Sequence, residues 1–165
     1  MGTAGPTEHL NGLSLGAARA ALIGCCASRR WVDAMLDARP FTSDAILYEA
    51  AERAWWALGG DDWLEAFGGH PRIGEGGRAD GLAQREQSGM RGVGEETRAA
   101  LVQGNREYEA RFGHVFLICA TGKSAAEMLG ALRGRLGNDP ATELRVAAGE
   151  QAKITRLRLE KLAAS

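Results

Sequence analysis

The chain has 165 residues, of which 45% are hydrophobic and 25% are charged, as is ordinary for one globular domain. Its net charge of −1 argues against broad electrostatic binding to nucleic acid or to an anionic membrane. The longest strongly apolar run, residues 115–120, is far shorter than the roughly 20 residues that span a bilayer. Three cysteines without ligand spacing and an N-terminus without a secretory signal fit a reducing cytoplasm better than a disulfide framework or a zinc site.

The composition predicts an all-α fold. Ile and Val are scarce, while Ala, Leu, Arg and Glu dominate, and this balance favours helices over strands. We expect a single-domain bundle of about seven to eight helices, preceded by a flexible segment over residues 1–13. The domain itself is expected to cover residues 14–165.

Serine and proline positions predict where the first helices begin and end. Three serines are placed as N-caps, and the residue before a proline avoids helical backbone. The expected helices cover residues 15–26, the stretch from Ser28 to the residue before Pro40, and residues 43–58. A short helical turn capped by Asp61 follows and ends at Phe67.

The middle of the chain is glycine-rich and irregular. Residues 68–80 cannot form a regular helix, and we expect a helix to resume near Leu82, pause around residues 89–94 and continue over 95–111. The apolar segment that follows, 112–122, fits a lone strand or a buried helical turn, and its periodicity does not decide between them.

Two further helix starts are clear near the C-terminus. Ser124 and Glu127 have the spacing of a capping box, which opens a helix to about Leu136. Asp139 followed by Pro140 is typical of an N-cap and a first helical residue, and the last helix is expected to reach about residue 162.

His70 is the most informative candidate for chemistry, because it lies in the glycine-rich loop, before a proline, and titrates near neutral pH. For a single loop histidine, a surface position without a role is the more frequent outcome. His9 and His114 carry less information, since the first lies in the expected flexible segment and the second at a helix end. No motif predicts a metal site.

Several other features have ordinary structural explanations. Thr121–Ser124 ends like a phosphate-binding loop, but the upstream glycine is missing, since Phe116 holds that position. The tryptophans at 55, 56 and 63 are typical of core packing or of an interface. The arginines near the end of the last helix are typical of a solvated face whose aliphatic stems cover the core.

Motifs spread along most of the chain resemble one family. The segments are ARPF (38–41), GGHPRIGE (68–75), REQSGM (85–90), NREYEARFGHVFLICATGKS (105–124), EMLGALRGRLGND (127–139) and KITRLRL (153–159). In this order they are similar to the 2-oxo-4-hydroxy-4-carboxy-5-ureidoimidazoline (OHCU) decarboxylases of uric-acid degradation, with the likeness spanning residues 14–162. The loop between His70 and Glu86 is shorter than in animal-type members, as in bacterial variants.

The resemblance implies a carboxy-lyase that converts OHCU to (S)-allantoin and carbon dioxide without a cofactor or metal. It assigns catalytic roles to His70 as general acid/base, Glu86 as its partner base, and Arg158 as the anion-binding group. The implied substrate-binding residues are Pro71, Ala83, Gln87, Phe116, Leu117, Ile118, Cys119 and Ala120. The family often has a serine where this chain has Ala83.

Two alternatives stay open on the residues alone. One is a helical interaction module without activity, with the tryptophans as a docking patch. The other is a decarboxylase of a related ureido or hydantoin acid. The expected partner is a small-molecule substrate, with no nucleic acid and no membrane; a homodimer is compatible with the sequence, which does not determine the oligomeric state.

Overall fold

The computed structural model describes residues 5–73 and 94–162. Within these residues the chain forms eight helices and no strand, which confirms the all-α prediction and the expected number of helices. The helices are α1 (Pro6–Gly12), α2 (Leu15–Ile23), α3 (Arg29–Ala38), α4 (Asp44–Trp56), α5 (Gly60–Phe67), α7 (Glu95–Phe112), α8 (Ala125–Arg135) and α9 (Pro140–Glu160). No helix in the described ranges has the length and apolar character needed to cross a membrane. The helix expected near residue 82 and most of the 68–80 loop lie outside the described residues.

The serine caps are confirmed. The hydroxyls of Ser14, Ser28 and Ser43 each accept a hydrogen bond from the backbone N–H three residues later, at 3.2, 3.3 and 3.1 Å. Each bond satisfies one of the N–H groups that a helix start leaves without an intrahelical partner. The cap predicted at Asp61 is wrong: α5 begins at Gly60, which places Asp61 in the first turn, where its charge favours the helix dipole.

The C-terminal helix starts follow the prediction as well. The Ser124 hydroxyl accepts from the Glu127 N–H at 3.1 Å, and the Glu127 carboxylate accepts from the Ser124 N–H at 3.2 Å, so the capping box is complete. The Asp139 carboxylate accepts from the backbone of Thr142 at 3.4 Å, beside Pro140 in the first position of α9. Side chains adjacent in sequence therefore determine both helix starts.

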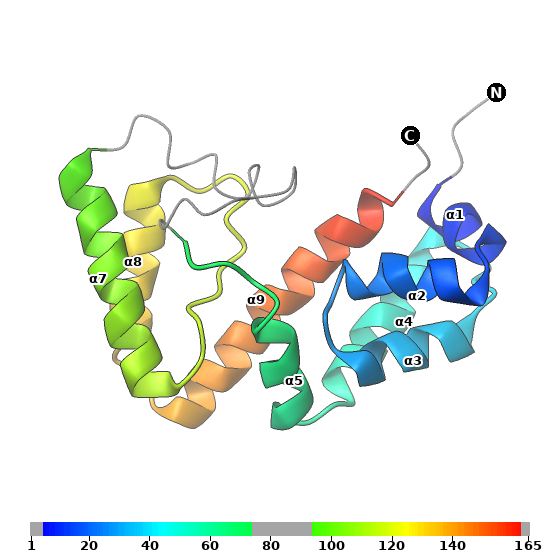
Figure 1. The fold of residues 1–165 in the computed structure, drawn as a ribbon, viewed down its shortest axis with the longest axis horizontal. Coiled ribbons are helices and arrows are strands. Elements are labelled where there is room, and N and C mark those ends of the chain that lie inside the picture. Colours follow the sequence, from blue (N-terminus) through cyan, green and yellow to red (C-terminus); the bar gives the residue numbers. More distant parts are fainter. Residues whose placement is uncertain (1–4, 74–93, 163–165) are drawn as a thin grey trace. The chain divides into compact units, whose positions relative to one another are not determined.

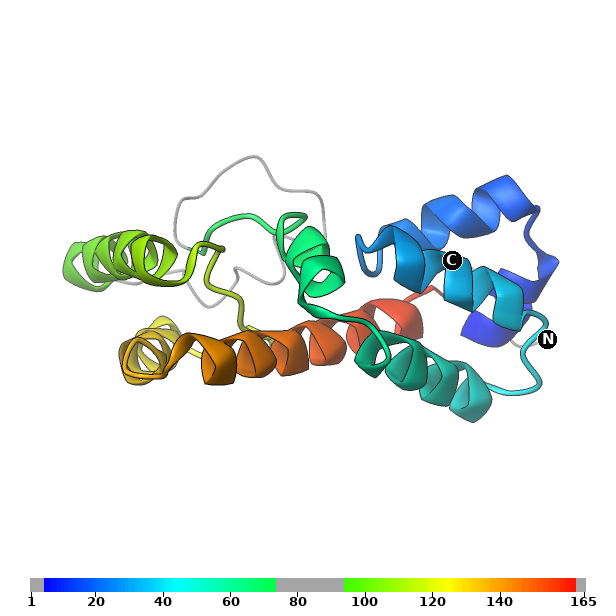
Figure 2. The ribbon, with the colours of Figure 1, turned by 90° about the horizontal axis from the view of Figure 1, so that it is seen from below.

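The chain divides into two compact units. The first contains residues up to Gly69 together with the chain from Gln151 onward. In this unit α3 lies between α2 and α4 (Figure 2). Its core is built from fully or nearly fully buried apolar side chains on all of its helices, among them Leu10, Leu22, Trp31, Met35, Leu47, Trp55, Phe67 and Leu159. That residues 14–165 form one domain stays a prediction.

The segment expected to be flexible contains helix α1, whose Leu10 is fully buried. Arg39 donates hydrogen bonds to the carbonyl oxygens of Leu10 and Leu13, at 2.8 and 3.0 Å. The Asn11 amide pairs in both directions with the backbone of Phe41, at 2.8 and 2.9 Å. These bonds reach the segment that follows α3, so residues distant in sequence hold α1 on the first unit.

The second unit, His70–Glu150, is built around α7 and α8, which lie side by side (Figure 1). Helix α7 ends at Phe112 and is capped by Gly113, whose left-handed backbone (φ 79°) is readily adopted only by glycine. The chain then passes through residues 113–120 as irregular backbone, so neither a strand nor a helical turn forms there. The core of this unit contains Ile73, Leu101, Tyr108, Phe116, Ile118, Ala120, Ala125, Met128, Leu129 and Leu132.

Candidate functional site

His70 is half-buried and opens the second unit. Two residues later, the Arg72 guanidinium forms a bidentate pair with the Glu109 carboxylate of α7, with N–O distances of 2.7 and 2.9 Å. This pairing lowers the pKa of Glu109 below its ordinary value. The loop that carries His70 is therefore attached to α7 by a charge-assisted contact of defined geometry.

A second contact attaches the same loop one residue further on. The Asn105 side chain, fully buried in α7, donates a hydrogen bond of 2.7 Å to the Ile73 carbonyl oxygen. The Ile73 side chain is itself buried in the core of the unit. Residues 72 and 73 are thus held by an ion pair, a buried amide and apolar packing together.

Residues 116–120, the segment that the resemblance assigns to substrate binding, are all buried. Charged side chains hold their backbone: Arg135 donates to the Leu117 carbonyl at 2.8 Å, and the Cys119 N–H donates to the Glu150 carboxylate at 3.0 Å. In the Thr121–Ser124 segment, Lys123 donates to the Cys119 carbonyl at 3.1 Å and the Ser124 hydroxyl accepts from Glu127 as a helix cap. The irregular backbone is stabilised by side chains where a strand would use a partner strand.

A buried polar network supports that segment. Glu143 is fully buried and accepts hydrogen bonds from Arg135 at 2.5 and 2.8 Å, from Asn138 at 3.0 Å and from the Tyr108 hydroxyl. Burial, as the larger cause, and the hydrogen bond to Glu143 both raise the pKa of Tyr108 well above its ordinary value. The Arg135 guanidinium also lies 4.6 Å from the centre of the Phe116 ring, a cation–π distance.

The structure brings the His70 loop and the 116–120 segment into one unit. Ile73 belongs to the same buried cluster as Phe116, Ile118 and Ala120. The sequence predicted both segments as parts of a site. It did not predict the polar residues that hold them, such as Glu143, because a glutamate on a helix carries no sequence signal of burial. For Asn105 and Tyr108 a signal existed, since both belong to the quoted motif around residues 105–116.

Arg158 lies in the first unit, near the end of α9. It is half-buried, and its guanidinium donates to the Gly24 carbonyl oxygen at 3.5 Å. Beside it, burial raises the pKa of Cys25 to about 12 and that of Cys26 to about 11, although the Arg158 charge acts in the opposite direction. His70 and Arg158 belong to different units, so their convergence on one pocket stays a prediction.

The remaining predicted site residues differ in what the structure describes. Pro71 is exposed beside His70. Ala83, Glu86 and Gln87 lie outside the described residues, and their roles stay predictions. In the described ranges no group of three or more His, Cys, Asp or Glu side chains is arranged to hold a metal ion.

The tryptophans do not form an open docking patch. Trp55 and Trp63 are buried, while Trp56 is 42% exposed and donates to Glu52 at 2.8 Å.

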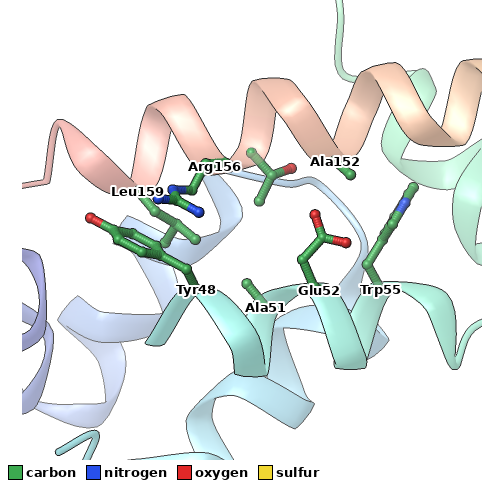
Figure 3. Close-up of a pocket in the computed structure, with 8 residues that line it drawn as sticks. Tyr48, Ala51, Glu52, Trp55, Ala152, Arg156 and Leu159 are labelled. Carbon is green, nitrogen blue, oxygen red and sulfur yellow. The ribbon is translucent and has the colours of Figure 1, made fainter. Parts of the chain in front are cut away.

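A shallow hollow between α4 and α9 has room for little more than one water molecule. Figure 3 shows it lined by side chains of both helices. The Arg156 guanidinium lies 3.8 Å from the centre of the Tyr48 ring. It contains none of the predicted site residues.

The His114 ring packs against two aromatic side chains at the end of α7. Its ring stacks on Phe112 with centres 6.3 Å apart and meets Tyr108 edge-on at 5.4 Å. Its Nδ1 lies 3.1 Å from the Val115 carbonyl oxygen. The ring therefore packs where α7 gives way to the irregular segment.

Comparison with known proteins extends this picture. The family model for OHCU decarboxylase matches residues 11–160. The uric acid degradation bifunctional protein TTL of Arabidopsis thaliana is 39% identical over 148 residues, covering 84% of this chain and 45% of that protein. An OHCU decarboxylase of Amia calva is 36% identical over 84 residues, covering 51% of this chain and 48% of that one. The chain thus spans about half the length of these curated relatives.

Solved structures agree with the fold. A crystal structure of OHCU decarboxylase in the presence of (S)-allantoin superposes with a TM-score of 0.76 at 36% identity, covering 85% of this chain and 94% of that one. An (S)-allantoin synthase at 19% identity has a TM-score of 0.71 and shows the same fold. With a family model that covers nearly all of its length and a similar solved structure of matching size, this chain belongs to the OHCU decarboxylase family.

Proposed function

We propose that the chain catalyses the decarboxylation of OHCU to (S)-allantoin and carbon dioxide in uric-acid degradation. The observation that carries the proposal is the family match over residues 11–160. The solved relative with (S)-allantoin, matched over 94% of its own length, supports the same activity. The proposed class of enzyme is a carboxy-lyase.

The proposed reaction breaks the bond between the carboxylate and ring carbon 4 of the substrate. The bonding pair moves toward carbon 5, whose C=N bond accepts the displaced π electrons on nitrogen. The nitrogen takes up one proton from solvent. Protonation of carbon 5 on one face then creates the stereocentre of (S)-allantoin, and loss of the hydroxyl proton turns carbon 4 into a carbonyl. Carbon dioxide leaves without the electron pair of the broken bond, which stays in the ring, so the reaction needs no oxidant or reductant. The C=N bond of the substrate is the electron sink.

Three side chains have proposed roles in this sequence. His70, in a loop held at Arg72 and Ile73, would move a proton between solvent and the reacting carbon or nitrogen. Arg158 would bind the anionic substrate, since a guanidinium offers a planar pair of donors. Glu86 would orient the hydroxyl or ureido groups and polarise His70. Their convergence is tested by a crystal structure with bound allantoin, and an Arg158 directed away from the ligand would refute the assignment.

The backbone of residues 116–120 is proposed to bind the ring and ureido amides. Support comes from its irregular conformation, because its backbone groups are not used in a helix or sheet; those that Arg135, Glu150 and Lys123 do not bind would bind the ligand. Arg135 and Glu150 hold the backbone of residues 117 and 119, which pre-organises the segment before substrate arrives. Proposed contacts from Pro71, Ala83 and Gln87 would complete the binding site.

We further propose that catalysis needs neither a metal nor an organic cofactor. The chemical support is the electron sink within the substrate. Dialysis against a chelator should leave the rate unchanged, and activity that disappears on chelation and returns with a divalent ion would overturn this proposal.

A cytoplasmic location is supported by three buried free thiols and a balanced net charge. A homodimer stays a prediction, to be checked by light scattering.

The direct test adds purified protein to freshly generated OHCU. The proposal expects faster loss of the ultraviolet absorbance of OHCU and enantiopure (S)-allantoin as the product. An interaction module would produce neither effect. Competition between OHCU and related ureido or hydantoin acids tests whether the chain is a decarboxylase of one of those acids. A preference for one of them would reassign the substrate.

A further inference from the structure

Two α7 side chains hold the chain that immediately follows His70. Asn105 and Glu109 are four residues apart on α7 and therefore lie on the same face of that helix. Asn105 binds the Ile73 carbonyl at 2.7 Å, and Glu109 binds the Arg72 guanidinium at 2.7 and 2.9 Å. Building on the proposed function, we infer that Asn105 and Glu109 are positioning residues that act on His70 through Ile73 and Arg72.

The chain between these anchors and His70 is stiff. The ring of Pro71 fixes its own φ angle, and the residue before a proline is restricted to extended backbone. Few soft torsions therefore separate the anchored backbone of Arg72 from the α-carbon of His70. Anchoring residues 72 and 73 consequently limits the positions that His70 can adopt. A displacement of about 1 Å is enough to lower a rate by about 100-fold.

The two contacts fix the positions of residues 72 and 73, and the ion pair contributes little to the free energy of unfolding. The side chains of Arg72 and Glu109 are 51% and 25% exposed, and ion pairs this accessible contribute little to the stability of a fold. Their bidentate form, however, restricts direction as well as distance. Asn105 is buried, and the bond that its amide donates to the Ile73 carbonyl oxygen fixes the backbone of that residue; its Oδ1 atom has no hydrogen-bond partner among the described residues.

The test uses variants of the ion pair, because variants of the buried Asn105 also disturb the core. Glu109→Gln keeps the size of the side chain and removes its charge, and Arg72→Lys keeps the charge and removes the planar fork. Glu107→Gln is the matched control: it makes the same substitution on α7 at an exposed residue that pairs only locally with Gln103 among the described residues. All variants are first shown to unfold near the temperature of the parent protein.

The first readout is turnover of OHCU. We expect Glu109→Gln and Arg72→Lys to lower kcat by about 10-fold to 100-fold with a smaller change in KM, and Glu107→Gln to have no effect. Combined with His70→Ala, either variant should cause no additional loss, because the residue that it positions is absent. Equal losses with and without His70 would overturn the inference.

The second readout is independent of activity. The ring resonances of the three histidines are followed by NMR as a function of pH. We expect the His70 resonance or its titration midpoint to move in Glu109→Gln and Arg72→Lys, while that of His9 stays unchanged. An unmoved His70 in both variants would overturn the inference, even with an active enzyme. A moved His70 in a protein that does not convert OHCU would refute the proposed function and leave the positioning role supported.

Discussion

Replacing Glu143 by alanine is expected to destabilise the protein strongly. The substitution removes a fully buried carboxylate that accepts from Arg135, Tyr108 and Asn138. The Arg135 side chain, 11% exposed, would then keep its bond to the Leu117 carbonyl but lose its counter-charge. An uncompensated buried charge and an unpaired hydroxyl are among the most costly defects in a folded protein.

The magnitude follows from the degree of burial. Breaking a buried ion pair by removing one partner costs about 3–5 kcal/mol. Because Arg135 retains one carbonyl partner and some solvent access, we expect the lower end, about 3 kcal/mol. For a protein of this size, each kcal/mol lowers Tm by about 2–4 °C, so Tm should fall by about 6–12 °C.

The assay is thermal and urea unfolding followed by circular dichroism. Glu49→Ala is the control, because Glu49 pairs with Arg53 on the surface of α4, and its loss should change the unfolding free energy by less than about 0.5 kcal/mol. The double variant Glu143→Leu/Arg135→Met replaces both charges with apolar groups and should recover part of the lost stability, since the Tyr108 hydroxyl and the Leu117 carbonyl still lose these partners. A Glu143→Ala protein as stable as Glu49→Ala would refute the reasoning.

Three further predictions concern activity, thiols and packing. His70→Ala should keep the fold and lose about 10²–10⁴-fold in rate, leaving racemic allantoin from uncatalysed decay; a near-normal rate with enantiopure product would assign the proton transfer elsewhere. Cys25 and Cys26, whose pKa values burial raises to about 12 and 11, should not react with Ellman's reagent at pH 8 until urea unfolds the protein, and rapid labelling of the native state would contradict their burial. Gly104→Ala places a methyl group 2.5 Å from a buried Leu132 methyl and should cost about 1–3 kcal/mol, an effect that added Leu132→Ala partly relieves if the clash is the cause; a cost unchanged by the second substitution in a double-mutant cycle would rule the clash out.

Local chemistry determined much of the secondary structure. The starts of α2, α3, α4 and α8 depend on serine side chains that bond to backbone only three residues away. The scarcity of β-branched residues was enough to predict an all-helical fold. These features are readable from the sequence because the interacting groups are neighbours along the chain.

The family motifs also allowed candidate site residues to be named in advance. They identified the His70 loop and the 116–120 segment, which the structure places in one unit around a shared core. The roles of His70, Glu86 and Arg158 and of the substrate-binding residues remain predictions. A motif names a residue, but it does not contain the distances on which its chemistry depends.

Tertiary structure alone decided how the candidate segments are held. The irregular course of residues 113–120 follows from Arg135 and Glu150, which bind its backbone from other helices. The docking of α1 depends on Arg39 and Asn11, which bridge residues about thirty positions apart. A charged side chain in a partly buried position stabilises the fold only when the folded chain supplies a hydrogen-bonding partner for it. Because that partner is distant in sequence, only the assembled fold shows whether the charge is paired.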